Sequence, residues 1–542
     1  MIYDKTPHYA HHADLPYAKE PWKSLYVYQR LFTTLLLVPY WALYYLLTPR
    51  SWRPRPSWNL RQIIFVFFTR RIFKVTEVAG VTWGTRNPES EPKPGELKET
   101  RFEWVEPLAD TLRCGIINDD RVPYAKVGVY IWPKEPPLPP TTSSASAPSS
   151  ASSDQPVDGK PPSTTDTGSS DTVVDVESSA ADVPIIGVFF HGGGYTHMSA
   201  HEKSRTSRIP RNLVKQKMMS EVYGAEYRLL QFAPFPAVVQ DAAAVYAHVV
   251  KKHNREKGKC KIVLIGDSSG GNLALALARW IRDEARLPMP DGLLLLSPSC
   301  DTSHAIPQTH SSYVPRPNAE TDYLVDTIEP RALLQTTFLG FKYYPPRHHI
   351  HLNPDERHHE EERKLMEVVH SEYVSVASPR VLHRWGHEIA QHDVDPTNPG
   401  EQDRGPEVDT ASVRDRRRLD KKTKSIPMQF SCVAVPDPDA DDLPVREANL
   451  DTPGVESPYR KTGRFPTLFS GFPRTRIVIG DAERLVREVS SLTKAMERDG
   501  VDVQTDWVPD AVHDLLIIAE GWWDEPARAK VWKGIDEWMK GF

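Results

Sequence analysis

A serine flanked by glycines is the first feature of this sequence that points to chemistry. It stands in Gly266-Asp267-Ser268-Ser269-Gly270, between the apolar run 261–265 (KIVLI) and a stretch of helical periodicity at 272–283. A G-x-S-x-G motif between a strand and a helix forms a sharp turn that projects the serine hydroxyl from the edge of a sheet. The helix that follows directs its positive end at the same place. Ser268 is therefore predicted to be a nucleophile.

Three successive glycines stand upstream, in His191-Gly192-Gly193-Gly194-Tyr195, directly after the apolar run 184–190. Glycines expose backbone N–H groups and reach conformations closed to other residues. We expect the N–H groups of Gly192 and Gly193, with that of Ser269, to form an oxyanion hole. A phosphate-binding loop is disfavoured because no Lys-Ser or Lys-Thr pair follows the glycines. His191 is predicted to hold this loop, whereas His197 and His201 are expected at the surface.

A serine nucleophile of this type needs a histidine base later in the chain. His513 lies in 509–514 (PDAVHD), just after the strand candidate 501–507. A loop at the carboxyl end of a strand is where a histidine can face the nucleophile. His513 is the predicted base.

The acid that orients the histidine is expected just after the strand candidate 476–479, where Asp481 and Glu483 stand two residues apart. Asp481 could instead cap a helix, and Glu483 could interact with a helix dipole. Glu483 is preferred as the acid, and Asp481 is the alternative.

Alternating strand and helix candidates must position these residues. The strand candidates are 126–132, 184–190, 227–232, 261–265, 293–297, 476–479 and 501–507, and the helix candidates are 238–252, 272–283, 485–498 and 526–540. Apolar strands separated by helices predict an α/β fold, a mostly parallel central sheet with helices on both faces. We assign 76–542 to this catalytic domain and 1–75 to an N-terminal membrane-anchor and cap segment.

Two insertions are predicted to interrupt the domain and to be disordered. Residues 134–182 are rich in Pro, Ser, Thr and Ala and have no aromatic residue, so they cannot offset the entropy cost of ordering. They are expected to extend a hairpin-like connection between 126–132 and 184–190. The second insertion, 345–449, is charged, with a possible helix near 363–376. It holds a histidine cluster that we interpret as solvated rather than metal-binding: His348, His349, His351, His358 and His359.

The uncharged run 31–47, bracketed by Arg30 and Arg50, predicts a membrane segment. At about 1.5 Å per residue it is a little short of a ~30 Å hydrocarbon core. A signal peptide and a buried core helix are the alternatives, although no small-residue cleavage site follows. The stretch 63–68 (IIFVFF) could lie on a bilayer surface or cover the substrate, and both interpretations stay open. The lysines and arginines flanking 31–47 weakly favour a cytosolic catalytic domain.

Composition excludes several classes of protein. The chain has 67 Lys and Arg against 72 Asp and Glu. It therefore lacks the basic excess that is typical of nucleic-acid-binding proteins. The 4 cysteines show neither paired metal-ligand spacing nor the density of a disulfide scaffold.

Taken together, HGGGY, GDSSGGN, GDAERL and DAVHD resemble the hormone-sensitive-lipase-like branch of the α/β-hydrolases, the fold-3 group. The resemblance covers about 126–542 apart from the insertions. It supports Glu483, since the family's acid opens a segment similar to 483–485. That acid is usually Asp, and glutamate lengthens the arm by one methylene. The N-terminal segment is similar to membrane-anchored fungal relatives of arylacetamide deacetylase and steryl acetyl hydrolase. This resemblance implies an endoplasmic-reticulum membrane with the catalytic domain in the lumen. The lysines and arginines that flank 31–47 favour the cytosol instead, so the side of the membrane on which the catalytic domain lies stays open.

These residues predict a serine carboxylic-ester hydrolase with a Ser268–His513–Glu483 triad that needs no cofactor. The resemblance implies lipophilic esters, such as acetylated sterols or aryl esters, as substrates. Two alternatives remain: a catalytically idle protein that binds a lipid or a partner, and an amidase or carbamate hydrolase with the same triad. The sequence does not indicate an oligomeric state.

Overall fold

The computed structural model describes residues 17, 19–79, 86–120, 122–136, 183–302, 316–324, 368–387 and 466–542. The chain divides into two compact units, Met1–Ile389 with Lys461–Phe542, and Ala390–Arg460. The second unit, residues 137–182 and the histidine cluster at 348–359 lie outside the described residues.

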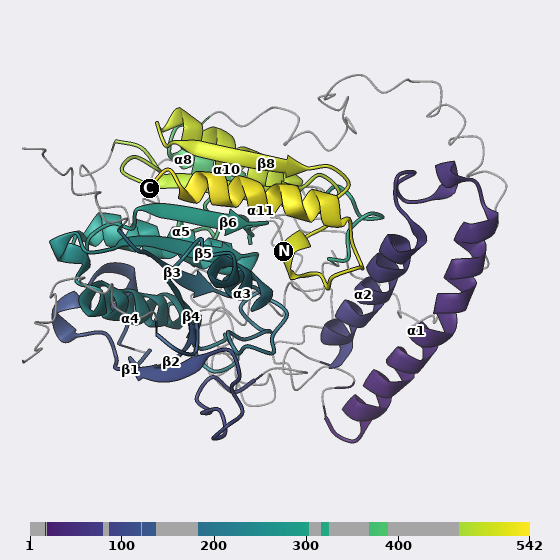
Figure 1. Ribbon diagram of the computed structural model, residues 1–542, viewed down its shortest axis with the longest axis horizontal. Coiled ribbons are helices and arrows are strands. Elements are labelled where there is room, and N and C mark those ends of the chain that lie inside the picture. The colour runs from purple at the N-terminus through teal and green to yellow at the C-terminus, as the bar shows by residue number, and fades with distance from the viewer. Residues whose placement is uncertain are drawn as a thin grey trace, which may run out of the picture. The chain divides into compact units, whose positions relative to one another are not determined.

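The core of the first unit is an eight-stranded sheet of order β1-β2-β4-β3-β5-β6-β7-β8 (Figure 1). Its strands are β1 (Arg101–Val105), β2 (Val127–Trp132), β3 (Ile185–Phe190), β4 (Glu221–Glu226), β5 (Lys261–Asp267), β6 (Gly292–Leu296), β7 (Arg474–Gly480) and β8 (Val503–Val508). The pairs β1–β2 and β2–β4 are antiparallel, and every pair from β4–β3 to β7–β8 is parallel. The predicted mostly parallel α/β sheet is confirmed.

Strand β4 corrects two expectations. It runs over Glu221–Glu226, whereas the candidate 227–232 is a loop. Because β4 pairs with both β2 and β3, residues 126–132 and 184–190 do not form a hairpin. The strand was not recognised in the sequence because it begins and ends with a glutamate. Glu221 forms an ion pair with Arg101, and Glu226 accepts a hydrogen bond from Ser199 at 2.8 Å.

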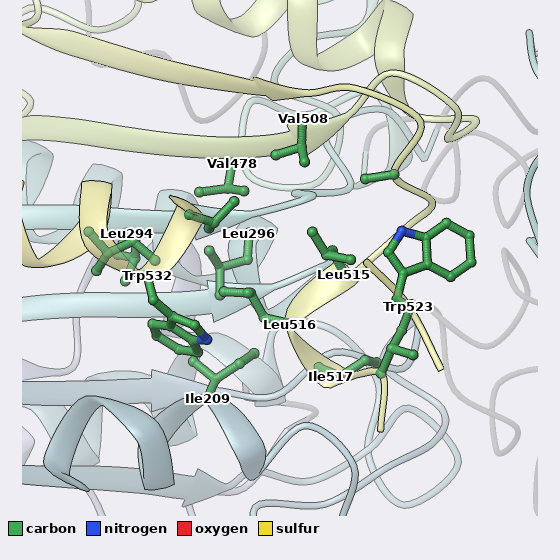
Figure 2. Packing of buried hydrophobic residues seen from close by; sticks show 14 of the residues in the cluster. Ile209, Leu294, Leu296, Val478, Val508, Leu515, Leu516, Ile517, Trp523 and Trp532 are labelled. Atoms are coloured by element: carbon green, nitrogen blue, oxygen red, sulfur yellow. The ribbon is translucent and has the colours of Figure 1, made fainter. Parts of the chain in front are cut away.

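Helices cover both faces of the sheet. The main ones are α3 (Arg208–Lys215), α4 (Ala237–Lys252), α5 (Ser269–Glu284), α10 (Val486–Arg498) and α11 (Glu525–Met539). Ile209 of α3 and Trp532 of α11 pack with Leu294 and Leu296 of β6 in one buried cluster (Figure 2). Because Leu295, between these two leucines, is also fully buried, the opposite face is covered too; α4, α5 and α10 contact the strands there.

Two N-terminal helices form a hairpin, α1 (Trp22–Leu47) and α2 (Leu60–Ala79) (Figure 1). Trp41 of α1 meets Phe67 of α2 edge-on, with ring centroids 5.5 Å apart. Helix α1 begins earlier than the predicted run 31–47 and is, among the described residues, the one helix long and apolar enough to cross a membrane. Ile63 and Val66 of α2 are fully buried, so these two residues of the stretch 63–68 pack against the protein.

Part of the second predicted insertion is folded. Residues 368–387 include a short helix, α8 (Pro379–Arg384). Ser378 caps the N-terminus of this helix, because its Oγ accepts a hydrogen bond from the Val381 N–H at 3.3 Å. The Val374 carbonyl accepts a hydrogen bond from the Asn272 side chain at 3.1 Å, which joins this segment to helix α5. The segment therefore supports the helix that follows Ser268.

Candidate active site

Ser268 occupies a tight turn between β5, which ends at Asp267, and α5, which begins at Ser269. Its φ of 50° and ψ of −119° lie in a region that side chains rarely adopt, a strain typical of functional sites. Two positions before Ser268 and two positions after it, only glycine fits. A Cβ at Gly266 would lie 2.1 Å from the Gly270 carbonyl oxygen, and one at Gly270 would lie 2.0 Å from the Phe190 oxygen.

The glycine loop after β3 lies directly against this turn. A Cβ on Gly192 would be 3.1 Å from Ser268 Cβ, and the Tyr195 N–H donates to Ser269 Oγ at 3.2 Å. Gly193 has a φ of 115°, which requires glycine. The structure thus brings Gly192, one of the predicted oxyanion donors, close to Ser268, and Gly193 and Ser269 are the chain neighbours of these two residues.

His191 is enclosed at the base of the glycine loop, as expected of a residue that holds it. Its ring stacks on Tyr227, with centroids 4.3 Å apart, and its Nδ1 lies 2.8 Å from the Gly192 carbonyl oxygen. Burial lowers the pKa of His191 to about 4, so the ring is neutral near pH 7. The expected surface location of His201 is wrong, since that side chain is buried, and His197 is half-buried.

His513 and Glu483 meet beside the C-terminal ends of β7 and β8. His513 Nδ1 lies 2.8 Å from Glu483 Oε2, and both side chains are buried. The other carboxylate oxygen, Oε1, accepts from Ser297 Oγ at 2.9 Å and from the Gly480 N–H. Burial raises the pKa of Glu483 to about 7, and the hydrogen bond from His513 opposes that rise.

Asp481, the alternative acid, faces away from His513. Its Oδ1 accepts from the Asp510 N–H at 2.7 Å and lies 3.3 Å from Arg55 Nη1. Its side chain is 42% exposed, unlike that of Glu483.

The second nitrogen of His513 faces a carboxylate that sequence reasoning did not single out. His513 Nε2 lies 3.1 Å from Asp514 Oδ2, and within the described residues no hydrogen bond joins it to Ser268 Oγ. Burial alone would lower the pKa of His513, but the carboxylates of Asp514 and Glu483 raise it well above its ordinary value. Asp514 directly follows His513 in the sequence, and in the structure it has a φ of 51°.

A further buried carboxyl, Asp267, precedes Ser268. Burial raises its pKa well above the ordinary value, the Asp514 carboxylate adds to that rise, and the Gly192 N–H opposes it. Among the described residues, no group of three His, Cys, Asp or Glu side chains could hold a metal ion.

Comparisons with known proteins point to the same fold. Residues 187–407 match the family described as alpha/beta hydrolase fold. The carboxylic ester hydrolase LipN of Mycobacterium tuberculosis is 32% identical over 129 residues, 23% of this chain and 33% of that protein. The versiconal hemiacetal acetate esterase of Aspergillus parasiticus is 24% identical over 161 residues, 29% of this chain and 46% of that protein.

A human protein, arylacetamide deacetylase-like 2, is 33% identical over 103 residues, 18% of this chain and 25% of that protein. The chain thus spans less than half the length of each of these three relatives. The matched residues include the glycine loop and the serine turn. Together with the order of the sheet, they show that this chain has the alpha/beta-hydrolase fold.

Proposed function

We propose that this chain is a serine carboxylic-ester hydrolase in which Ser268, His513 and Glu483 form the catalytic triad. The observation that carries the proposal is the buried 2.8 Å contact between His513 and Glu483, in the same domain as a serine held at a strained turn. An acid that contacts Nδ1 holds the imidazole in the tautomer whose Nε2 can accept a proton.

In the proposed reaction, Ser268 Oγ attacks the ester carbonyl carbon while His513 takes the hydroxyl proton. The N–H groups of Gly192, Gly193 and Ser269 stabilise the oxyanion, and losing one such donor typically costs ~10²-fold or more. His513 then gives its proton to the leaving alcohol. A water molecule, deprotonated by His513, releases the acid and restores the serine.

The proposal requires His513 Nε2 to leave Asp514 and contact Ser268 when the ester binds. Catalytic hydrogen bonds are often long in ligand-free enzymes and tighten in the complex. The exchange of partners needs Asp514, which directly follows His513 in the chain, to turn away from the imidazole ring.

Lipophilic esters are the proposed substrates, and acetate esters the first to test. The support is the exposed apolar surface of α1, which would place the enzyme at a membrane where such esters partition. Two relatives are named for acetate or acetyl chemistry, an acetate esterase and a deacetylase-like protein. Acetylated sterols or aryl esters in the endoplasmic-reticulum membrane fit the N-terminal resemblance described above.

The test uses the full chain in detergent with p-nitrophenyl esters of increasing acyl length. We expect Ser268→Ala to lower the activity by at least ~10³-fold and to leave the unfolding temperature unchanged. Matched p-nitroanilides separate an esterase from an amidase. Ester hydrolysis retained by Ser268→Ala would contradict the triad, and a folded wild type that hydrolyses nothing would favour a binding protein.

A further inference from the structure

The N-terminal hairpin touches the two loops that carry the proposed acid and base. We define the acid loop as residues 480–485 and the histidine loop as residues 509–514. We propose that Arg55, Trp58 and Arg70 of the hairpin are positioning residues, which hold both loops in catalytic register. The hairpin would then be part of the catalytic structure, in addition to any membrane contact. The catalytic consequence rests on the proposed function.

The first set of contacts comes from the segment between α1 and α2. Arg55 donates to the Asp481 carbonyl oxygen of the acid loop at 2.9 Å and lies 3.4 Å from the Asp510 carboxylate of the histidine loop. Trp58, which is fully buried, donates from Nε1 to the Asp510 carbonyl oxygen at 2.9 Å. Both loops are therefore held through their backbone carbonyls by one short segment.

The second set comes from the middle of α2. Arg70 donates from Nε to the Asp322 carbonyl oxygen at 2.8 Å. The Asp322 side chain, fully buried, accepts from the Arg484 N–H of the acid loop at 2.8 Å and from the His513 N–H at 3.5 Å. Arg70 thus reaches the same two loops through Asp322.

The loops also depend on each other. The Ala482 N–H donates to the Ala511 carbonyl oxygen at 3.0 Å. Asp510 has a φ of 58°, a conformation that costs free energy for a residue with a side chain and persists where its surroundings hold it. The Arg55 and Trp58 contacts at Asp510 supply that hold. Since a misplacement of about 1 Å can cost ~10²-fold in rate, loosening these contacts should lower turnover without removing a reacting group.

The experiment compares Arg55→Ala, Arg70→Ala and Trp58→Phe in the full detergent-solubilised chain. We expect kcat on p-nitrophenyl acetate to fall by about tenfold or more with KM changed less than about threefold, because the small ester does not need the hairpin to bind. Arg55→Lys, which keeps the charge and one donor nitrogen, should recover part of kcat. The matched control is Arg61→Ala, since Arg61 also lies on α2 but donates to Gly521, outside both loops.

Hydrogen exchange of the amides at 509–514 gives a readout independent of turnover. We expect faster exchange there in Arg55→Ala and Arg70→Ala, and wild-type exchange in Arg61→Ala. Exchange and kcat equal to the control in both alanine variants would overturn the inference. If the wild type hydrolyses no ester, the proposed function fails, and the exchange data alone then decide whether the hairpin holds the loops.

Discussion

At the scale of single residues, the site contains more carboxyl groups than a triad needs. Asp514 lies 3.1 Å from the ring nitrogen that a serine hydroxyl would use. His513 also has Glu483 on Nδ1, and the Asp322 carboxyl and the Tyr323 hydroxyl lie against its backbone. A carboxylate on Nε2 favours the charged imidazolium, the form that cannot act as a base.

The first prediction concerns the pH dependence of the reaction. Asp514 raises the pKa of His513, so the imidazole should become neutral, and the enzyme active, only at higher pH. Asp514→Asn removes that charge and should lower the pKa of His513, which extends activity to lower pH. We expect the acidic limb of the kcat/KM profile for p-nitrophenyl acetate to move to lower pH. Asp502→Asn, at a 65% exposed carboxylate in an ion pair with Arg474, is the control and should leave the limb in place.

An acidic limb that does not move in Asp514→Asn would show that His513 does not face Asp514 in the working enzyme. A limb that moves equally in the Asp502→Asn control would point instead to a change in overall charge.

At the scale of secondary-structure elements, long apolar runs were predictable and long-range contacts were not. Strand β5 and helix α5 were predicted because an apolar run (KIVLI) indicates a buried strand and the helical periodicity after it indicates a helix. The serine turn must then lie between them. Strand β4 was missed because its glutamates become compatible with burial only through partners elsewhere in the chain. Trp58 and Asp510 form a hydrogen bond although they lie 452 positions apart in the sequence. No local sequence pattern predicts such a contact.

The candidate site divides in the same way. Ser268, His513 and Glu483 each follow a recognisable strand, so their loops could be placed at one edge of the sheet before the structure was known. The choice between Glu483 and Asp481 needed a side-chain direction, which depends on how the acid loop packs against Ala511.

The second prediction concerns the close approach of β3 to the serine turn. Gly270→Ala would place a methyl group 2.0 Å from the Phe190 oxygen and 2.8 Å from the His191 oxygen, both backbone atoms that cannot rotate away. The glycine loop must then move from Ser268, so we expect activity to fall by ~10²-fold or more and stability by about 1–3 kcal/mol. Ester hydrolysis and thermal unfolding measure the two effects.

Ala276→Gly is a matched control within the same helix, since it should cost roughly 1 kcal/mol of stability without touching the turn. Equal loss of activity in both variants would mean that the loss follows stability and not the geometry at Ser268. Wild-type activity in Gly270→Ala would contradict the close approach itself.

At the scale of the whole molecule, apolar surface is concentrated on α1. Leu36 is 59% exposed and Leu46 is 71% exposed, whereas α2, which lies beside α1 in Figure 1, contributes Ile63 and Val66 to the buried core. Soluble monomers rarely expose contiguous apolar surface of this kind, and such surfaces mark contacts with membranes or other proteins. The arrangement gives the hairpin two sides, an outer one that is apolar and exposed and an inner one that contacts the acid and histidine loops.

The last prediction separates these two sides. Leu35 and Leu36 lie near the middle of α1 and are both mostly exposed, so the double change to Asp should cost about 3 kcal/mol per residue in a bilayer. We expect the full chain to stay with alkaline-washed membranes and the double variant to be released. Trp22→Asp, at the first residue of α1, should stay bound because that end can remain in water.

Neither leucine belongs to the set of hairpin residues that contact the acid and histidine loops, so the released variant should keep its activity on p-nitrophenyl acetate. Retention of the double variant on membranes would contradict α1 as the anchor. Release accompanied by a loss of turnover on this soluble ester would instead show that the catalytic loops depend on lipid contact at the outer side. The pair of measurements therefore tells whether the two sides of the hairpin work independently.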